Sequence, residues 1–236
     1  MSKVEQSFLT VAIGASAGGL EAFKVFFECL PVDTGMSFVV IQHLSASQES
    51  MLTEILSRFT KIPVQVVKDG MPVEPDHVYV IPPGAAMTIE QKILKLTSKG
   101  KSLRPIDTFF ISLAEDLKSQ SIGIVLSGTG SDGTEGLKAI KAHGGITFAQ
   151  TPDSAQYGDM PQSAISAEAT DFVLNPDKIA LELQKIAKNP HIARREIATR
   201  DEAGQKEEKP TKETSLNAIF TTVSYTHLTL PTKRIV

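Results

Sequence analysis

Cysteine and histidine are scarce in this chain of 236 residues, which has one cysteine, Cys29, and five histidines. A single cysteine excludes an internal disulfide and any zinc site built from several cysteines. No H-x-x-x-H or C-x-x-C spacing occurs, so we expect neither a metal ion nor another cofactor. Cys29 lies beside Leu30 in an apolar stretch and is expected to pack in the core.

The chain also lacks long hydrophobic runs and a strong excess of one charge. No run of 18 apolar residues is present, which excludes a transmembrane helix. A secretory signal is absent as well, because Lys3 and Glu5 precede only a short apolar run, Phe8–Ile13. The 24 basic and 27 acidic residues give a net charge of −3, whereas a general nucleic-acid binder carries a basic excess. We therefore expect a reduced cytoplasmic protein with no nucleic-acid partner and no membrane insertion.

Short β-branched runs alternate with amphipathic stretches over residues 1–190. The expected strands are Leu9–Ile13, Ser37–Gln42, Val64–Val67, His77–Ile81, Ile122–Leu126, Ile146–Ala149 and Phe172–Leu174. The expected helices are Leu20–Leu30, Ser50–Phe59, Asp107–Leu117 with Asp107 as its cap, Thr134–Ala142, Gln162–Ala169 and Asp177–Ala187. Met87–Glu90 and Ile93–Leu96 form one antiparallel hairpin. This alternation predicts a doubly wound α/β domain whose mostly parallel sheet has helices on both faces.

Composition changes after residue 190. Residues 191–214 hold six basic and six acidic residues and no aromatic one, which is typical of a solvated linker. Val223–Thr232 reads VSYTHLTLPT and resembles the translation of a transposase-adapter sequence used in sequencing libraries. Residues 223–236 are therefore expected to be an artefact tail, and they are excluded from the interpretation of the fold.

The first expected strand runs directly into a turn with the pattern G-x-S-x-G, Gly14–Gly18. Such a turn exposes the hydroxyl of Ser16 at the carboxyl edge of the sheet. The following helix N-terminus offers free N–H groups that can hold an oxyanion. Two alternatives stay open, a small-residue turn that only permits close packing and a phosphate-cradling loop. A P-loop is excluded because no Lys-Ser/Thr pair follows.

Two further polar residues are expected at the same edge. His43 follows the strand Ser37–Gln42 and is a candidate base for Ser16. Asp132 follows the strand Ile122–Leu126 in a glycine-rich loop, where a carboxylate can orient a histidine. Helix capping by Ser131 or Asp132 is the alternative interpretation of that loop.

Ser16, His43 and Asp132 together form the set required for nucleophilic catalysis. The chain order Ser, His, Asp differs from the Ser, Asp, His order of the common α/β-hydrolases. Asp107 and Asp159 are competing candidates for the acid. The remaining histidines of the body and linker, His77, His143 and His191, fit structural or linker positions.

Several segments carry a family resemblance when they are taken in their order along residues 8–187. They are Ile13–Gly19, Gln42–Leu44, Tyr79–Pro83, Arg104–Asp107, Leu126–Gly133, and Met160–Pro161 followed by Ala164–Ile165. In these residues the chain resembles the catalytic domain of the chemotaxis protein-glutamate methylesterases of the CheB type. The resemblance implies that Ser16 is the nucleophile, His43 the base and Asp132 the orienting acid.

The resemblance also implies the substrate and the oxyanion donors. A methylesterase of this type hydrolyses glutamate γ-methyl esters on chemoreceptor helices, and some members deamidate receptor glutamines. Oxyanion and substrate contacts are expected from Ala17 and Gly18, and from Gly128, Thr129 and Gly130. Family members often have threonine at the position of Ala17 and methionine at that of Thr129, so a side-chain hydroxyl at position 17 is missing here.

The chain begins directly with the esterase-like domain, without the receiver domain that stand-alone family members carry in front. This start resembles hybrid proteins in which a methyltransferase follows the esterase, and Ser215–Phe220 resembles the opening of such a domain. We therefore expect an esterase domain over 1–190, a linker over 191–214 and the start of a methyltransferase over 215–222. The alternative to an enzyme is an inactive module that binds a receptor or a phosphate-bearing ligand.

Overall fold

The computed structural model describes residues 8–42, 51–97 and 104–189, which all lie in the first of two compact units, Met1–Ala193. His43 lies outside the described residues. The expected linker, methyltransferase start and artefact tail lie outside them as well. The fold is therefore reported for the esterase-like body alone.

Seven parallel strands form the central sheet, in the order β10-β9-β8-β1-β2-β5-β3. Their bounds are β1 Thr10–Ala15, β2 Ser37–Gln42, β3 Val64–Val66, β5 His77–Val80, β8 Ser121–Val125, β9 Ile146–Gln150 and β10 Phe172–Leu174. The four strands β1, β2, β8 and β9 are almost wholly buried. This burial explains why their sequences are mostly apolar and lack a regular alternation of polar and apolar residues.

The strand order reverses between β1 and β8. From β1 the chain builds the sheet outwards through β2 towards β5 and β3, and from β8 it builds the other half through β9 to β10. Ligands of open α/β sheets bind outside the carboxyl ends of the strands at such a switch point. The turn after β1 and the loop after β8 meet at this point.

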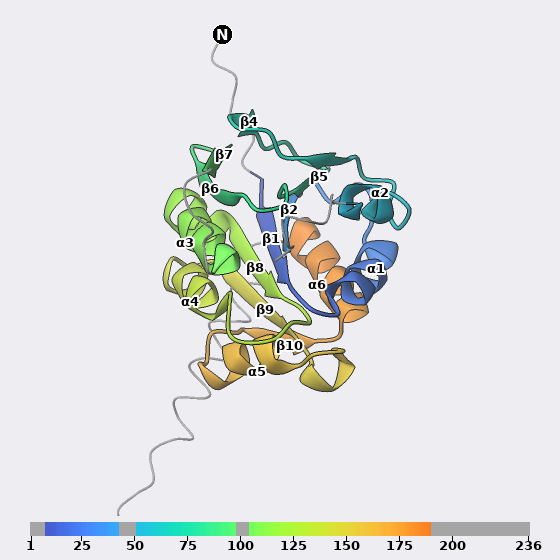
Figure 1. Ribbon diagram of the computed structural model, residues 1–236, viewed down its shortest axis with the longest axis vertical. Coiled ribbons are helices and arrows are strands. Elements are labelled where there is room, and N and C mark those ends of the chain that lie inside the picture. Colours follow the sequence, from blue (N-terminus) through green and yellow to red (C-terminus); the bar gives the residue numbers. More distant parts are fainter. Residues whose placement is uncertain (1–7, 43–50, 98–103, 190–236) are drawn as a thin grey trace, which may run out of the picture. The chain divides into compact units, whose positions relative to one another are not determined.

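Helices cover both faces of the sheet, as the alternating pattern predicts (Figure 1). They are α1 Gly19–Cys29, α2 Leu52–Leu56, α3 Pro105–Leu117, α4 Thr134–Ala142, α5 Asp159–Ser166 and α6 Pro176–Lys188. Helices α3 and α4 pack together on one face, and α1 packs against α6 on the other. The predicted fold class is confirmed.

A small antiparallel sheet packs against α3 through its strand β6. It contains the expected hairpin, β6 Ala86–Glu90 and β7 Ile93–Thr97, and a third short strand, β4 Met71–Pro72. Sequence patterns missed β4 because two residues carry no periodicity. The side chain of Asp116 in α3 accepts hydrogen bonds from the turn residues Gln91 and Lys92 at 2.7 and 2.9 Å.

Two local predictions were wrong. Cys29 is exposed, because the apolar face of α1 is formed by Ala22, Phe23, Phe26 and Phe27 and the cysteine ends the helix. Asp107 is not the cap of α3, since the helix begins at Pro105 after Arg104 and Asp107 lies inside its first turn.

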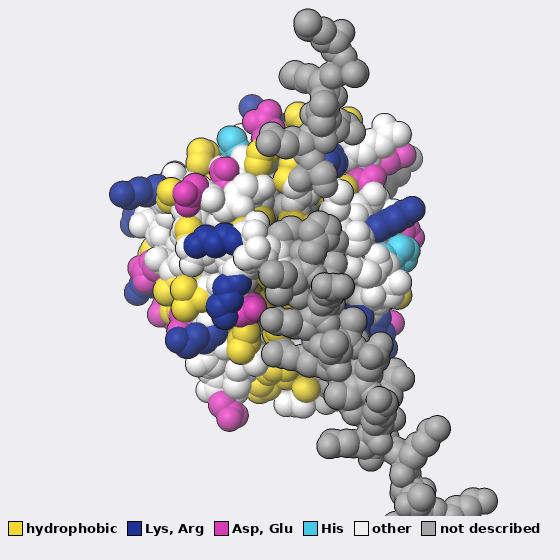
Figure 2. Space-filling model, turned by 180° about the vertical axis from the view of Figure 1, so that it is seen from behind, with side chains coloured by type: hydrophobic (Ala, Val, Ile, Leu, Met, Phe, Trp, Pro, Cys, Tyr) yellow, Lys and Arg dark blue, Asp and Glu magenta, His cyan; other side chains and the backbone are white. Residues whose placement is uncertain are grey.

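Charged side chains of both signs are interspersed over the face shown in Figure 2. This distribution agrees with the near balance of basic and acidic residues in the sequence. Among the described residues, no helix combines the length and the hydrophobicity that crossing a membrane requires.

Candidate active site

The serine turn connects β1 to α1 and is as tight as its sequence predicts. Gly18 adopts φ +71°, a left-handed conformation that favours glycine. A Cβ atom at Gly19 would lie 2.6 Å from the Cβ of Ala15, so glycine is needed there for close approach. Ser16 is half-buried, and its carbonyl oxygen accepts a hydrogen bond from the N–H of Gly19 at 3.0 Å.

The loop after β8 is hydrogen-bonded directly to this turn. The N–H of Ser16 donates to the carbonyl of Ser127 at 2.9 Å, and the hydroxyl of Ser127 donates to the carbonyl of Ala17 at 2.8 Å. The same hydroxyl accepts from the N–H of Tyr157 at 3.0 Å. The N–H of Ser127 donates to Oε1 of Gln150 at 2.9 Å. Buried Ser127 therefore connects its own loop to the serine turn, to the end of β9 and to the segment that contains Tyr157.

The glycine loop Gly128–Gly130 lies against the nucleophile candidate. A Cβ atom at Gly128 would lie 3.0 Å from the Cβ of Ser16 and 2.1 Å from the sulfur of Met160, so only glycine fits this position. The N–H of Gly128 donates to the carbonyl of Tyr157 at 2.9 Å. That N–H is therefore occupied and is not available to hold an oxyanion.

The N–H groups of Ala17 and Gly18 remain as oxyanion candidates. Within residues 8–42, 51–97 and 104–189, no acceptor takes a hydrogen bond from either of them. Gly18 is the N-cap residue of α1, and no side-chain hydrogen bond caps this helix. A helix N-terminus without a side-chain cap has unsatisfied N–H groups and a partial positive charge, and both stabilise an anion.

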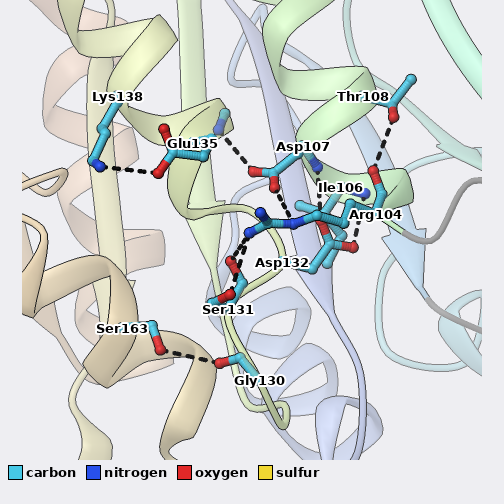
Figure 3. A network of polar contacts seen from close by, with 11 residues as sticks. Arg104, Ile106, Asp107, Thr108, Gly130, Ser131, Asp132, Glu135, Lys138 and Ser163 are labelled. Carbon is cyan, nitrogen blue, oxygen red and sulfur yellow. Dashed lines mark hydrogen bonds and ion pairs between the residues drawn. The ribbon is translucent and has the colours of Figure 1, made fainter.

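Asp132 lies half-buried at the far end of the same loop and caps a helix, though not the one that follows it. Its two carboxylate oxygens accept hydrogen bonds from the N–H groups of Ile106 and Asp107, at 3.2 and 3.0 Å (Figure 3). Helix α4, which the alternative interpretation would have capped, has Gly133 as its N-cap residue, and neither Ser131 nor Asp132 caps it with a side chain. A carboxylate has about four lone-pair sites. Asp132 therefore keeps acceptor capacity for a histidine while it caps α3.

Arg104 and Asp107 lie next to Asp132 (Figure 3). The guanidinium of Arg104 donates to the carbonyl of Ser131 at 2.7 Å and pairs with Asp107 at 2.7 Å. The other oxygen of Asp107 accepts from the N–H of Gly136 at 2.8 Å. Burial raises the pKa of the Asp107 carboxyl above its ordinary value of 3.8, and the charge of Asp132 adds to the rise against the opposing hydrogen bond from Gly136. Asp107 is thus an internal link between α3 and α4.

The sheet fixes the position of Gln42, the residue before His43. Strand β2 pairs with β1 up to Gln42 beside Ala15, so both strands leave the sheet at the same level. Ser16 follows one strand and His43 follows the other in the sequence. The structure brings Ser16 and the Asp132 loop to one edge, and the imidazole of His43 lies outside the described residues.

The other candidates occupy structural positions. His77 begins β5 with Nδ1 at 2.9 Å from the carbonyl of Pro75, and His143 ends α4 with Nδ1 at 2.8 Å from the carbonyl of Ala139. Asp159 is the first residue of α5 and is exposed. Across the described ranges, no group of three or more His, Cys, Asp or Glu residues is arranged to hold a metal.

Sequence reasoning missed Ser127 and Gln150 as members of the site. Both are buried and both stand at or just after the end of an apolar strand. A polar residue at the end of an apolar strand was the sequence feature that could have indicated their place in the site. Their partners come from distant loops, so the contacts themselves left no trace in the local sequence.

Comparison with known proteins gives one consistent match. The family model described as CheB methylesterase matches residues 11–183. A protein-glutamate methylesterase/protein-glutamine glutaminase of Leptospira interrogans is 35% identical over 178 residues, which are 74% of this chain and 92% of that protein. A 104.1 kDa protein of Rhodobacter capsulatus is 42% identical over 130 residues, 54% of this chain and 14% of its own length.

A solved structure supports the same family assignment. The crystal structure of the Thermotoga maritima CheB methylesterase catalytic domain superposes with a TM-score of 0.71 at 29% identity, covering 77% of this chain and 100% of that one. The chain spans about half the length of several other curated relatives, 52–55% of each. A catalytic role is thereby supported over that of an inactive binding module.

Proposed function

Because the chain belongs to the CheB methylesterase family, we propose that it hydrolyses glutamate γ-methyl esters on the cytoplasmic helices of methylated chemoreceptors. Deamidation of receptor glutamines follows the same chemistry and releases ammonia in place of methanol. The observation that carries the proposal is the direct hydrogen bonding of the Ser16 turn to the loop that bears Asp132, at the switch point of the sheet.

The proposed reaction passes through an acyl-enzyme. The hydroxyl of Ser16 attacks the γ-carbonyl carbon of the ester, and His43 takes the serine proton. The resulting oxyanion accepts hydrogen bonds from the N–H groups of Ala17 and Gly18, while Asp132 orients His43. His43 then protonates the departing methoxide, which leaves as methanol.

Water completes the cycle. It attacks the acyl carbon, gives its proton to His43 and expels Ser16, to which the proton returns. The products are a glutamate carboxylate and the free enzyme. In this proposal Gly128, which lies against Ser16, and Thr129 contact the substrate, and the carbonyl of Gly130 accepts a hydrogen bond from the hydroxyl of Ser163 at 3.1 Å.

Exposed apolar residues beside the serine turn support a protein substrate. Leu20 is 40% exposed and Tyr157 is 43% exposed. Leu20 is the second residue of α1, and the backbone of Tyr157 is hydrogen-bonded to Ser127 and Gly128. Large apolar side chains that border a site offer contact area to a packed receptor helix.

We also propose that residues 1–190 form the esterase domain of a longer cytoplasmic protein, with 191–214 as linker and 215–222 as the start of a methyltransferase domain. Support comes from the resemblance of Ser215–Phe220 and from the Rhodobacter capsulatus relative, which carries its matching region in a 104.1 kDa chain.

Replacement of the nucleophile tests the function. Ser16→Ala is expected to lower methanol release from a methylated receptor by at least about 10³-fold, because no hydroxyl remains to form the acyl-enzyme. Rapid acid quench and mass spectrometry of the wild type should show the substrate acyl group on the peptide that contains Ser16. Ser166→Ala removes an exposed hydroxyl on α5 and is the matched control, expected to keep wild-type activity. Methanol release by Ser16→Ala at the wild-type rate would eliminate the covalent mechanism.

A further inference from the structure

A cavity of about 510 Å³ opens beside the serine turn, on the side of the sheet that α1 and α6 cover. Helix α1, the segment between β9 and α5, and the start of α6 form its walls. Gly18 and Ser127 belong to its lining, and Ser16 does not. The cavity therefore adjoins the proposed nucleophile and is separate from it.

The lining is mixed, with apolar surface beside polar side chains, and two of these polar side chains are satisfied within the protein. Ala22, Val25 and Pro176 supply apolar surface. The hydroxyl of Ser127 donates to the carbonyl of Ala17, and Nε2 of Gln150 donates to the carbonyl of Ser154 at 3.0 Å. Because Ser127 and Gln150 are hydrogen-bonded within the protein, the remaining polar and charged lining residues decide what the cavity binds.

The charged residues that line the cavity are both acidic. Glu21 comes from the first turn of α1 and Asp177 from the first turn of α6, and no described lysine, arginine or histidine lines the cavity. Each helix N-terminus contributes roughly half a positive charge. Two full negative charges outweigh these contributions. Nζ of Lys178 lies 3.5 Å from Asp177, but this pair is exposed and contributes little.

Gln156 adds an acceptor between the cavity and the serine turn. The position of a Cβ atom at Gly18 would be 2.7 Å from Cβ and 2.9 Å from Oε1 of Gln156, so this side chain lies across Gly18. Within the described part of the chain, the carboxamide of Gln156 makes no hydrogen bond. Its oxygen can accept from an N–H donor in the cavity, and its NH2 group can donate to an acceptor.

We propose that this cavity is a substrate subsite for a lysine or arginine side chain of the receptor, located one helical turn from the glutamate that reacts with Ser16. The inference rests on the proposed function. The aliphatic stem would pack on Ala22, Val25 and Pro176, and the cationic end would meet Glu21 and Asp177. On a helix, residues three or four positions apart share one face at about 5–6 Å between Cβ atoms. A basic residue so placed reaches the cavity while the glutamate faces the serine.

The test compares receptor fragments that carry lysine, alanine or glutamate at three and four positions on either side of one methylated glutamate. For the wild type, kcat/KM is expected to be roughly five- to tenfold higher with lysine than with alanine at the matching position. The double variant Glu21→Gln/Asp177→Asn should lose this preference and keep the wild-type rate on the alanine substrate. Glu28→Gln, on the exposed face of α1 outside the cavity, should retain the preference. Higher salt should reduce the preference.

The outcomes separate the two proposals. Equal kcat/KM for lysine and alanine substrates, or a preference for glutamate, would overturn the subsite and leave the esterase intact. A uniform loss of activity in the folded double variant, with thermal unfolding as the check, would also overturn the subsite. Absence of hydrolysis of every fragment by the wild type would overturn both proposals.

Discussion

Ser127 holds the serine turn in place with all of its polar groups. Its N–H, carbonyl and hydroxyl contact Gln150, Ser16 and Ala17 respectively, and its hydroxyl also accepts from Tyr157. A buried polar residue is tolerated only when its hydrogen bonds are made. Here the partners are the backbone atoms that shape the site, so one side chain fixes the relative positions of three loops.

Ionisation of Asp107 opposes folding. Burial raises the pKa of its carboxyl, so the folded protein binds this proton more tightly than the unfolded chain. The free energy of unfolding therefore falls as the pH rises from the unfolded pKa, about 4, through the higher folded pKa.

Asp107→Asn removes this titration. The free energy of unfolding of the wild type minus that of the variant is expected to be larger at about pH 4 than at about pH 7, because only the wild type loses stability over that interval. Urea unfolding of both proteins across this range measures the difference. A difference that stays constant with pH would show that Asp107 does not titrate in this way. Glu115→Gln, an exposed carboxyl on the same helix, is the control.

Helices α3 and α4 approach closely at Gly136. A Cβ atom at Gly136 would lie 2.4 Å from the Cβ of Phe110, a backbone-proximal atom that cannot move away easily. The N–H of Gly136 also holds the buried carboxylate of Asp107. The spacing of the two helices, and with it the cap that Asp132 provides to α3, depends on this contact.

Gly136→Ala is therefore expected to destabilise the protein. The added methyl group forces α3 and α4 apart, at a cost of about 1–3 kcal/mol in the free energy of unfolding. Lys138→Ala, on the exposed side of α4, should change stability by less than about 0.5 kcal/mol. Chemical denaturation of both variants provides the measurement, and equal effects of the two substitutions would contradict the close contact.

At the scale of the elements, long apolar strands and amphipathic helices were predictable, and special turns were not. The turn Gln91-Lys92 has both residues at positive φ, 51° and 59°, without the asparagine or glycine typical of such a hairpin turn. Asp116 of α3 stabilises it from outside the hairpin. A turn that depends on a partner 24 or 25 residues away gives no local signal.

The buried apolar side chains of the described body come from residues 11–186 and form the layers on both sides of the sheet. Residues 191–214 are rich in charge and hold no aromatic residue. Such a segment has little apolar surface to add to a core. The esterase body is expected to fold without it.

Removal of residues 191–236 tests this expectation. The chain 1–190 should keep its melting temperature within about 2–4 °C of the full chain, which corresponds to about 1 kcal/mol at this size. Its esterase activity should be unchanged. Calorimetry and methanol release on both chains measure the two quantities. A truncated chain that melts far lower, or that is insoluble, would place part of the domain beyond residue 190.

The sequence by itself determined the α/β class, the serine turn and the loop of Asp132, because each depends on local patterns of apolar residues and glycines. Only the tertiary structure decided that Asp132 caps α3, that the N–H of Gly128 is occupied, and that an acidic cavity adjoins Gly18. These features arise where segments more than 20 residues apart are brought together by the parallel sheet. A one-dimensional pattern records which groups are present, and the packed fold selects which of them meet.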